Sequence, residues 1–181
     1  MSRVRFATAQ ALFDTFPETY KNINAKPTDQ FPIDFLKDLV SQSKFEDAVT
    51  FCCFLLPRRE AVWWACGCIR TFLGNIPQSQ AAGLLAAEAW VYNPDEQHRA
   101  AAAELGAKGD SNDPMTWLAL GAGWSGGMLM SQAPVPPFMT ARAVRIAILL
   151  TVRFFRKKDE LPPRLQACIA DAIGLAEKGL S

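Results

Sequence analysis

The chain has 181 residues, 50% apolar and 20% charged, which is enough for a domain with a sizeable core. Its 19 Lys and Arg residues nearly balance 18 Asp and Glu residues, and this balance argues against nucleic acid as the partner. The longest strongly apolar run, residues 146–152, is far shorter than the roughly 20 residues that cross a bilayer. With no membrane span and no secretory leader pattern, we expect a cytoplasmic protein.

Strand patterns are nearly absent from the sequence, because apolar residues recur at helical spacing rather than in alternation. The sequence therefore predicts an all-α fold. A short helix is expected near residues 4–14, followed over 16–32 by an irregular, mobile lead-in that contains three prolines. We expect residues 1–32 to form this N-terminal part and residues 33–181 to form a single helical domain.

Proline, glycine and capping residues mark the predicted helices. Pro77 is expected to begin one of them, Asn93 to cap another and Thr140 to cap a long one, and Asp113-Pro114 is a further start signal. About nine helices with short connectors predict an antiparallel bundle or a short helical-hairpin array. The predicted helices cover residues 4–14, 33–41, 44–56, 57–73, 77–92, 93–107, 115–122 and 140–156, with a last one after 162.

The main charge asymmetry is an acid-free stretch between Asp113 and Asp159. On the helix predicted in this stretch, five basic side chains fall within about 120° of one another. A basic stripe of this kind suggests an acidic protein partner, but a solvated face paired with internal acids, or a nucleic-acid or membrane surface, would give the same pattern. The five side chains are Arg142, Arg145, Arg153, Arg156 and Lys157.

Two adjacent tryptophans fall on different faces of the helix predicted over residues 57–73. Trp64 belongs to an apolar stripe and is expected in the core. Trp63 lines up with Arg59 and Arg70, where it is either a cation–π brace for Arg59 or an anchor for a partner. We favour the brace, because a neighbouring helix can cover a tryptophan.

Residues 121–127 match two enzyme motifs, G-x-G-x-x-G and G-x-S-x-G. The first requires a preceding strand and an acidic residue about 20 positions later, and the second requires a histidine after the serine. The chain has a single histidine, His98, which precedes Ser125 and is expected to be a partly exposed helix residue near Asp95. We therefore expect no catalytic residue and interpret the segment as a tight glycine turn anchored by Trp124, with a Ser125–His98 hydrolase as an alternative.

The five cysteines, an odd number in apolar helical surroundings, are expected to be buried thiols. Cys66 and Cys68 resemble half of a zinc site. However, residues i and i+2 of a helix point about 200° apart, so the two sulfurs cannot easily hold one ion. The sequence predicts no metal and no cofactor.

Four blocks resemble an uncharacterised family of small all-helical bacterial proteins: Leu-Pro-Arg-Arg-Glu-Ala-Val-Trp-Trp-Ala-Cys at 56–66, Ala-Trp-Val at 89–91 with Pro94 and Arg99, Trp-Ser-Gly-Gly at 124–127, and Pro-Val-Pro-Pro at 134–137. The resemblance covers roughly residues 34–156 and brings no catalytic residues. Association of this family with type VI secretion gene neighbourhoods implies an accessory, adaptor or effector-linked role.

These observations predict a non-enzymatic protein–protein interaction module, most plausibly an accessory or adaptor protein of a secretion system with an acidic protein partner. An immunity protein that neutralises a cognate toxin, and a carrier of a small molecule or lipid, are the alternatives. The predicted partner-binding residues are Arg59, Trp63, Arg70, Trp124, Arg142, Arg145 and Arg153.

Overall fold

The computed structural model describes residues 3–129 and 131–180, which form ten α-helices and one 3-10 turn. Within these ranges the β-structure is limited to an isolated bridge between Met128 and Pro134, which confirms the all-α prediction. Nine of the ten helices have seven or more residues, close to the predicted number. No helix in the described part of the chain is long and apolar enough to cross a membrane.

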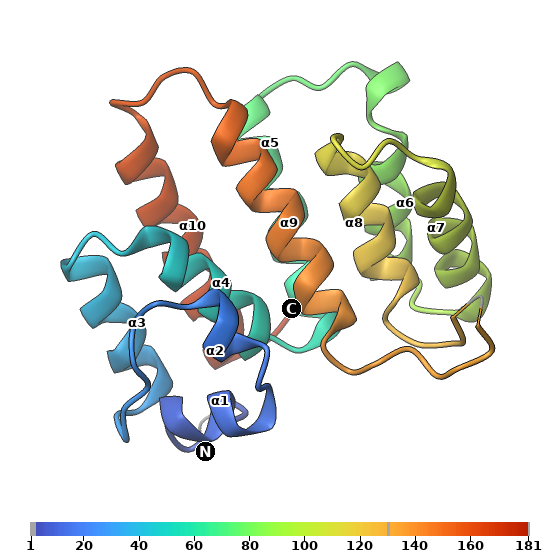
Figure 1. The fold of residues 1–181 in the computed structure, drawn as a ribbon. Helices are drawn as coiled ribbons and strands as arrows, with labels where there is room; N and C mark the ends of the chain where they lie inside the picture. Colours follow the sequence, from blue (N-terminus) through green and yellow to red (C-terminus); the bar gives the residue numbers. More distant parts are fainter. Residues whose placement is uncertain (1–2, 130, 181) are drawn as a thin grey trace. The chain divides into compact units, whose positions relative to one another are not determined.

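The contacts of the chain divide it into two compact units, one comprising residues 1–57 and 157–181 and the other residues 58–156 (Figure 1). Helix α10, near the C-terminus, belongs to the first unit because it packs on α4. The helices of the first unit are α1 (Ala9–Thr15), α2 (Thr19–Asn22), α3 (Pro32–Ser41), α4 (Phe45–Leu55) and α10 (Leu161–Lys178).

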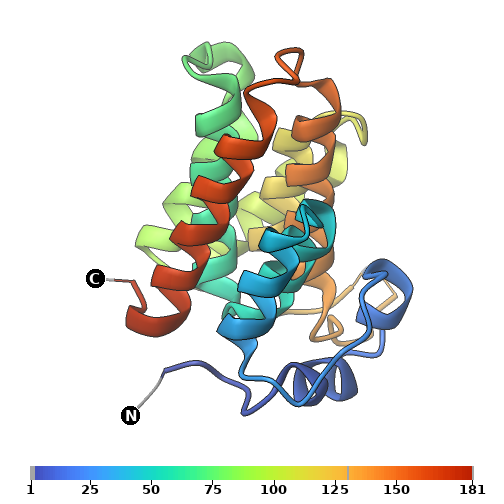
Figure 2. The same ribbon diagram turned by 90° about the vertical axis from the view of Figure 1, so that its left-hand side faces the viewer.

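Helix α4 is the centre of the first unit and packs on α2, α3 and α10. Its inner side contributes Phe51, whose ring lies 6.2 Å from that of Phe13 and 5.0 Å from that of Phe35. The first and last described residues lie close together (Figure 2), where the Arg3 guanidinium donates a 2.8 Å hydrogen bond to the Lys178 carbonyl. Burial of aromatic side chains around α4 therefore holds this unit together.

The predicted irregular lead-in contains α2 and is hydrogen-bonded to α4. Asp47 on α4 is only 4% exposed, and its carboxylate accepts hydrogen bonds from the backbone N–H groups of Asn24 at 3.0 Å and Ala25 at 2.9 Å. A proline-rich composition predicts irregular backbone, but it does not reveal that a carboxylate 22 residues away satisfies that backbone. The segment is thus part of the packed unit.

The second unit is built around α8, which packs on α5, α6, α7 and α9. Nearly every α8 residue that faces these neighbours is small or apolar, so four helices can approach it closely. In Figure 1, α6, α7 and α8 lie side by side. The elements of this unit are α5 (Arg58–Leu73), η1 (Gln78–Gln80), α6 (Ala82–Tyr92), α7 (Glu96–Lys108), α8 (Pro114–Gly123) and α9 (Met139–Phe154).

Local start signals correctly locate α8 but fail at three other helices. Asp95, and not the predicted Asn93, caps α7. Asp113 caps α8 by accepting a hydrogen bond from the Met115 N–H, and Pro114 occupies the first turn as predicted. Pro77 instead precedes the short η1 turn, and α6 begins at Ala82. Thr140 lies inside α9, where its hydroxyl donates to the Gly121 carbonyl at 3.0 Å rather than capping the helix.

Candidate interaction surface and pocket

The two arginines predicted on α5 are both bonded to α6. The Arg59 Nε donates to the Val91 carbonyl at 2.7 Å, and the Arg70 guanidinium makes two 2.8 Å hydrogen bonds to the Glu88 carboxylate. The hydrogen bonds to Glu88 raise the pKa of Arg70 above its ordinary value. Both side chains therefore join α5 to α6, and these hydrogen bonds lie within the second unit.

Trp63 lies between these arginines and contacts an aromatic ring on α6. The Trp63 and Tyr92 rings meet edge to face with their centroids 5.6 Å apart. Trp63 is half-buried, whereas Tyr92 is 67% exposed and Leu85, seven residues earlier on the same side of α6, is 43% exposed. We call Trp63, Leu85 and Tyr92 the α5–α6 face. Leu85 and Tyr92 are not among the residues predicted from the sequence, although their spacing places them on one side of the helix.

The glycine segment has two different roles in the structure. Gly121 and Gly123 lie within α8, where a Cβ on Gly123 would come 2.5 Å from the Ala103 Cα of α7. Only the later part forms a turn: Gly127 has a φ of +79°, and a Cβ there would come 2.7 Å from the Arg99 guanidinium carbon. The prediction of a single tight turn is therefore wrong for the first two glycines, which allow close helix packing.

Trp124 and Ser125 follow α8 and have structural contacts. The ring of Trp124 packs edge to face on Trp117, with centroids 6.3 Å apart, and the Ser125 carbonyl accepts a 2.7 Å hydrogen bond from Arg58. His98 is partly exposed and its Nδ1 lies 2.7 Å from Asp95 Oδ1, as predicted. Within the described ranges no hydrogen bond joins Ser125 to His98.

Asp95 caps α7 by accepting a 2.8 Å hydrogen bond from the His98 N–H. This bond, together with the side-chain contact to His98, lowers the pKa of Asp95. The His98–Asp95 pair therefore stabilises the start of α7.

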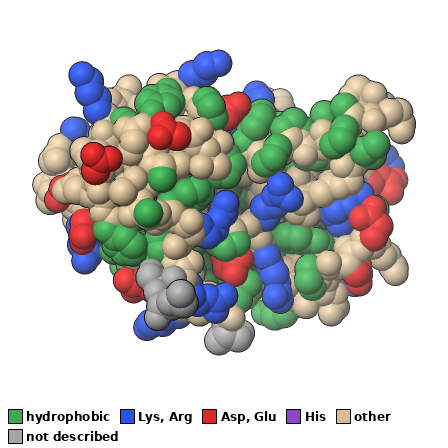
Figure 3. All heavy atoms as spheres, turned by 90° about the horizontal axis from the view of Figure 1, so that it is seen from below, with side chains coloured by type: hydrophobic (Ala, Val, Ile, Leu, Met, Phe, Trp, Pro, Cys, Tyr) green, Lys and Arg blue, Asp and Glu red, His purple; other side chains and the backbone are tan. Residues whose placement is uncertain are grey.

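The basic stripe predicted on α9 is only partly exposed. Arg142 and Arg153 are exposed and Arg145 is half-buried, while α9 packs on α5 and α8 through its apolar side. Arg142 has no side-chain hydrogen bond or ion pair to any other described residue. The seven predicted partner-binding residues thus separate into the α5 stripe, the turn at Trp124, and α9. Figure 3 shows that basic, acidic and hydrophobic side chains are intermixed on one face of the molecule.

All five cysteines are buried free thiols, as predicted. Burial raises the pKa of the Cys66 thiol well above its ordinary value, and the nearby Glu88 carboxylate raises it further. Burial, followed by the neighbouring Cys53, likewise raises the pKa of Cys52. Among the described residues, no three His, Cys, Asp or Glu side chains gather into a possible metal site.

We expect the native protein to resist thiol reagents. Burial excludes the reagent from the sulfurs. It also raises the pKa of the thiols, and because the thiolate is the reactive form, this further slows the reaction. Treatment with Ellman's reagent at pH 8 should modify none of the thiols within minutes, and addition of urea should release all five. Rapid modification of Cys52 or Cys66 in the native protein would contradict the observed burial.

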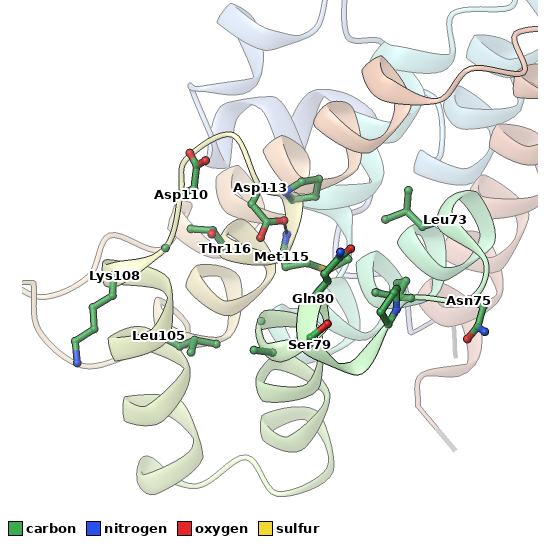
Figure 4. A pocket seen from close by; sticks show the side chains of 16 residues that line it. Leu73, Asn75, Ser79, Gln80, Leu105, Lys108, Asp110, Asp113, Met115 and Thr116 are labelled. Carbon is green, nitrogen blue, oxygen red and sulfur yellow. Dashed lines mark hydrogen bonds between the residues drawn. The ribbon is translucent and has the colours of Figure 1, made fainter.

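A pocket of about 710 Å³ opens at one end of the second unit (Figure 4). It is formed by the end of α5, the η1 turn, the start of α6, the end of α7 and the start of α8. Leu73, Leu105 and Met115 give it an apolar lining, and Asp113 and Thr116 lie at the α8 end. The sequence does not reveal this pocket, because its walls come from segments that are separated along the chain.

The fold and these features define a small all-helical protein with an exposed aromatic face and a surface pocket. The chain belongs to a family of unknown function, DUF6931, whose model matches residues 35–176. The match extends into α10, beyond the region 34–156 over which the sequence blocks carry the resemblance. No curated protein and no solved structure matches the chain.

Proposed function

We propose that the protein is a non-enzymatic protein–protein interaction module that docks its partner on the α5–α6 face. The observation that carries the proposal is the exposure of Tyr92, which is 67% accessible although its ring already packs against Trp63. An aromatic ring with one packed edge and an open face loses little conformational entropy on binding. Rings of this kind dominate the binding energy of many interfaces.

The surroundings of Tyr92 suit the centre and the rim of an interface. Leu85 adds an exposed apolar side chain on the same side of α6. The Arg70–Glu88 pair lies on the same two helices and can form a polar rim, since it is already paired before a partner arrives. A partner that covers this face therefore buries apolar surface without having to separate the ion pair.

The finer proposal is an accessory or adaptor role in type VI secretion, which is supported by the sequence resemblance. An acidic partner is supported by Arg142, whose exposed guanidinium has no ion pair among the described residues. Because the α5–α6 face and α9 present different chemistry, substitutions in each can be tested separately.

Replacing Tyr92 with alanine is expected to reduce partner capture at least about tenfold while leaving thermal stability nearly unchanged, because the ring is mostly exposed. The measurement is quantitative affinity purification from the native cell, comparing each variant with the wild type for the same co-purifying proteins. Met128→Ala is the matched control, since Met128 is 59% exposed and lies outside the α5–α6 face. Arg142→Glu should weaken capture if the partner is acidic.

Trp63→Ala distinguishes a supporting role from an anchoring role at the same face. Because Trp63 is half-buried under Tyr92, we expect a loss of roughly 2 kcal/mol in stability together with weaker capture. Capture that is equal for wild type, Tyr92→Ala and Met128→Ala would rule out this face as the docking site.

A further inference from the structure

The pocket in the second unit has the composition of a binding site for a small molecule. Its volume of about 710 Å³ falls within the range of 300–1,000 Å³ that is usual for ligand pockets. Leu73, Ile76 and Leu105 contribute apolar walls, and polar side chains come from the η1 segment, from the end of α7 with the loop after it, and from the start of α8. Such a lining suits a ligand with an apolar body and a polar head.

The hydroxyl of Thr116 is the first indication of what that head is. Thr116 lines the pocket and is only 8% exposed, yet its hydroxyl has no hydrogen-bond partner anywhere in the described residues. Thr116 lies in the first turn of α8, so no helical carbonyl is placed four residues before it. The backbone N–H of Asp113 is not a partner for the hydroxyl either, because it donates to the Asp110 carbonyl. Among the described residues no side-chain nitrogen or oxygen that is shut off from solvent lacks a partner, so the Thr116 hydroxyl is reached from the pocket, and a polar ligand group there can bond to it.

The carboxylate of Asp113 is the second indication. It is half-buried, and one of its oxygens accepts the capping hydrogen bond from the Met115 N–H at 2.9 Å. Lys108 also lines the pocket, but its ammonium is paired with Glu104 at 2.6 Å and its side chain points away from Asp113 and Thr116 (Figure 4). The Asp113 charge therefore has no cation beside it among the described residues.

We propose that this pocket binds a small organic cation, a primary ammonium on an apolar body. The ammonium donates hydrogen bonds to the Asp113 carboxylate and the Thr116 hydroxyl, while the body lies against the apolar walls. A charged hydrogen bond in a half-buried position gives orientation as well as affinity. The N–H groups at the start of α6 also border the pocket and favour an anion, so an anionic probe is the necessary competitor.

Three probes of similar shape test the proposal: phenethylammonium, 2-phenylethanol and 3-phenylpropionate. We expect ¹H–¹⁵N NMR titration to shift the amides of Gly83, Gly109 and Thr116 with phenethylammonium, with saturation in the millimolar range. The alcohol and the carboxylate should bind at least about tenfold more weakly, because neither supplies a positive charge to Asp113. Equal binding of the alcohol, or tighter binding of the carboxylate, would overturn the proposal.

Two variants separate binding from folding. Asp113→Asn removes the charge but keeps a side chain that caps helices equally well, so the melting temperature should hold while phenethylammonium binding falls at least about tenfold. Thr116→Val removes a hydroxyl that has no partner, so the melting temperature should stay constant or rise while binding weakens about threefold to tenfold.

The matched control is Asp110→Asn, since Asp110 is also an acid at this pocket but accepts hydrogen bonds from Asn112 in its own loop. This variant should change phenethylammonium binding less than about twofold. If Asp113→Asn and Asp110→Asn weaken binding equally, the effect is general electrostatics and the assigned contact is wrong. The test does not depend on the α5–α6 face, so the two proposals can fail separately.

Discussion

Alanine at Gly83 is expected to destabilise the protein by about 3 kcal/mol or more. Gly83 is in the first turn of α6, where an added Cβ would overlap the carbonyl oxygen and carbon of Met115 in α8. These are backbone atoms in the first turn of a capped helix, so relief requires α6 and α8 to move apart. For a chain of this size the melting temperature should fall by roughly 6–12 °C.

The matched control is the same substitution at Gly67, in the interior of α5. Gly67 is exposed, and a Cβ there would have no atom within 4 Å. Because alanine favours a helix by about 1 kcal/mol over glycine, Gly67→Ala should raise the melting temperature by about 2–4 °C. All five tryptophans lie in residues 58–156, so thermal unfolding followed by tryptophan fluorescence reports this unit directly. An unchanged melting temperature for Gly83→Ala would contradict the close packing of α6 on α8.

The glycines show why sequence patterns locate some features of this fold and not others. Helix ends depend on neighbouring residues, so Asp113-Pro114 could be predicted as a start and Gly74, which has a φ of +65°, as a stop. The role of an interior glycine depends on what packs opposite it. Gly83 and Gly67 are both helical glycines, and the backbone of Met115 lies against the first while nothing lies within 4 Å of a Cβ on the second.

The candidate interaction residues also include some features that the sequence predicts and others that only the tertiary structure reveals. Helical periodicity correctly placed Arg59, Trp63 and Arg70 on one side of α5, because that placement depends only on the rotation of about 100° per residue around the helix axis. It could not reveal that the Val91 carbonyl and the Glu88 carboxylate bind these arginines, since the register of α6 against α5 is set by tertiary packing. The exposed Tyr92 became recognisable only once this register was known.

The pocket could not be predicted from the sequence at all. Asp113 was recognised as a cap, and Thr116 had no feature that marked it. What makes Thr116 notable is that its side chain is mostly buried and lines the pocket, while its hydroxyl has no hydrogen-bond partner among the described residues. A missing partner can be seen only when every surrounding donor and acceptor has been placed.

Replacing Asp47 with alanine is expected to lower the free energy of unfolding of the first unit by about 3 kcal/mol. The buried carboxylate accepts hydrogen bonds from the N–H groups of Asn24 and Ala25, and a weaker one at 3.4 Å from the Asn24 side chain. These are the bonds that join the segment after α2 to α4, and alanine leaves their donors without an acceptor. Urea unfolding followed by far-UV circular dichroism should show a lower midpoint, and amide exchange at Asn24 and Ala25 should accelerate.

Two further substitutions show whether the effect comes from these bonds. Asp47→Asn keeps one acceptor oxygen but turns an NH₂ group toward a second donor. Its loss in free energy of unfolding should therefore lie between zero and the loss caused by alanine. Asp34→Ala removes an exposed carboxylate whose pairing with Lys37 is long, at 3.7 Å, and should cost about 0.5 kcal/mol or less. If Asp47→Ala behaves like Asp34→Ala, the lead-in is held by its other contacts, which include apolar packing and the backbone hydrogen bonds from Ala9 and Gln10 to the Gln30 and Thr28 carbonyls. A large loss confined to Asp47 means that a single buried carboxylate orders a proline-rich segment whose own sequence favours no regular structure.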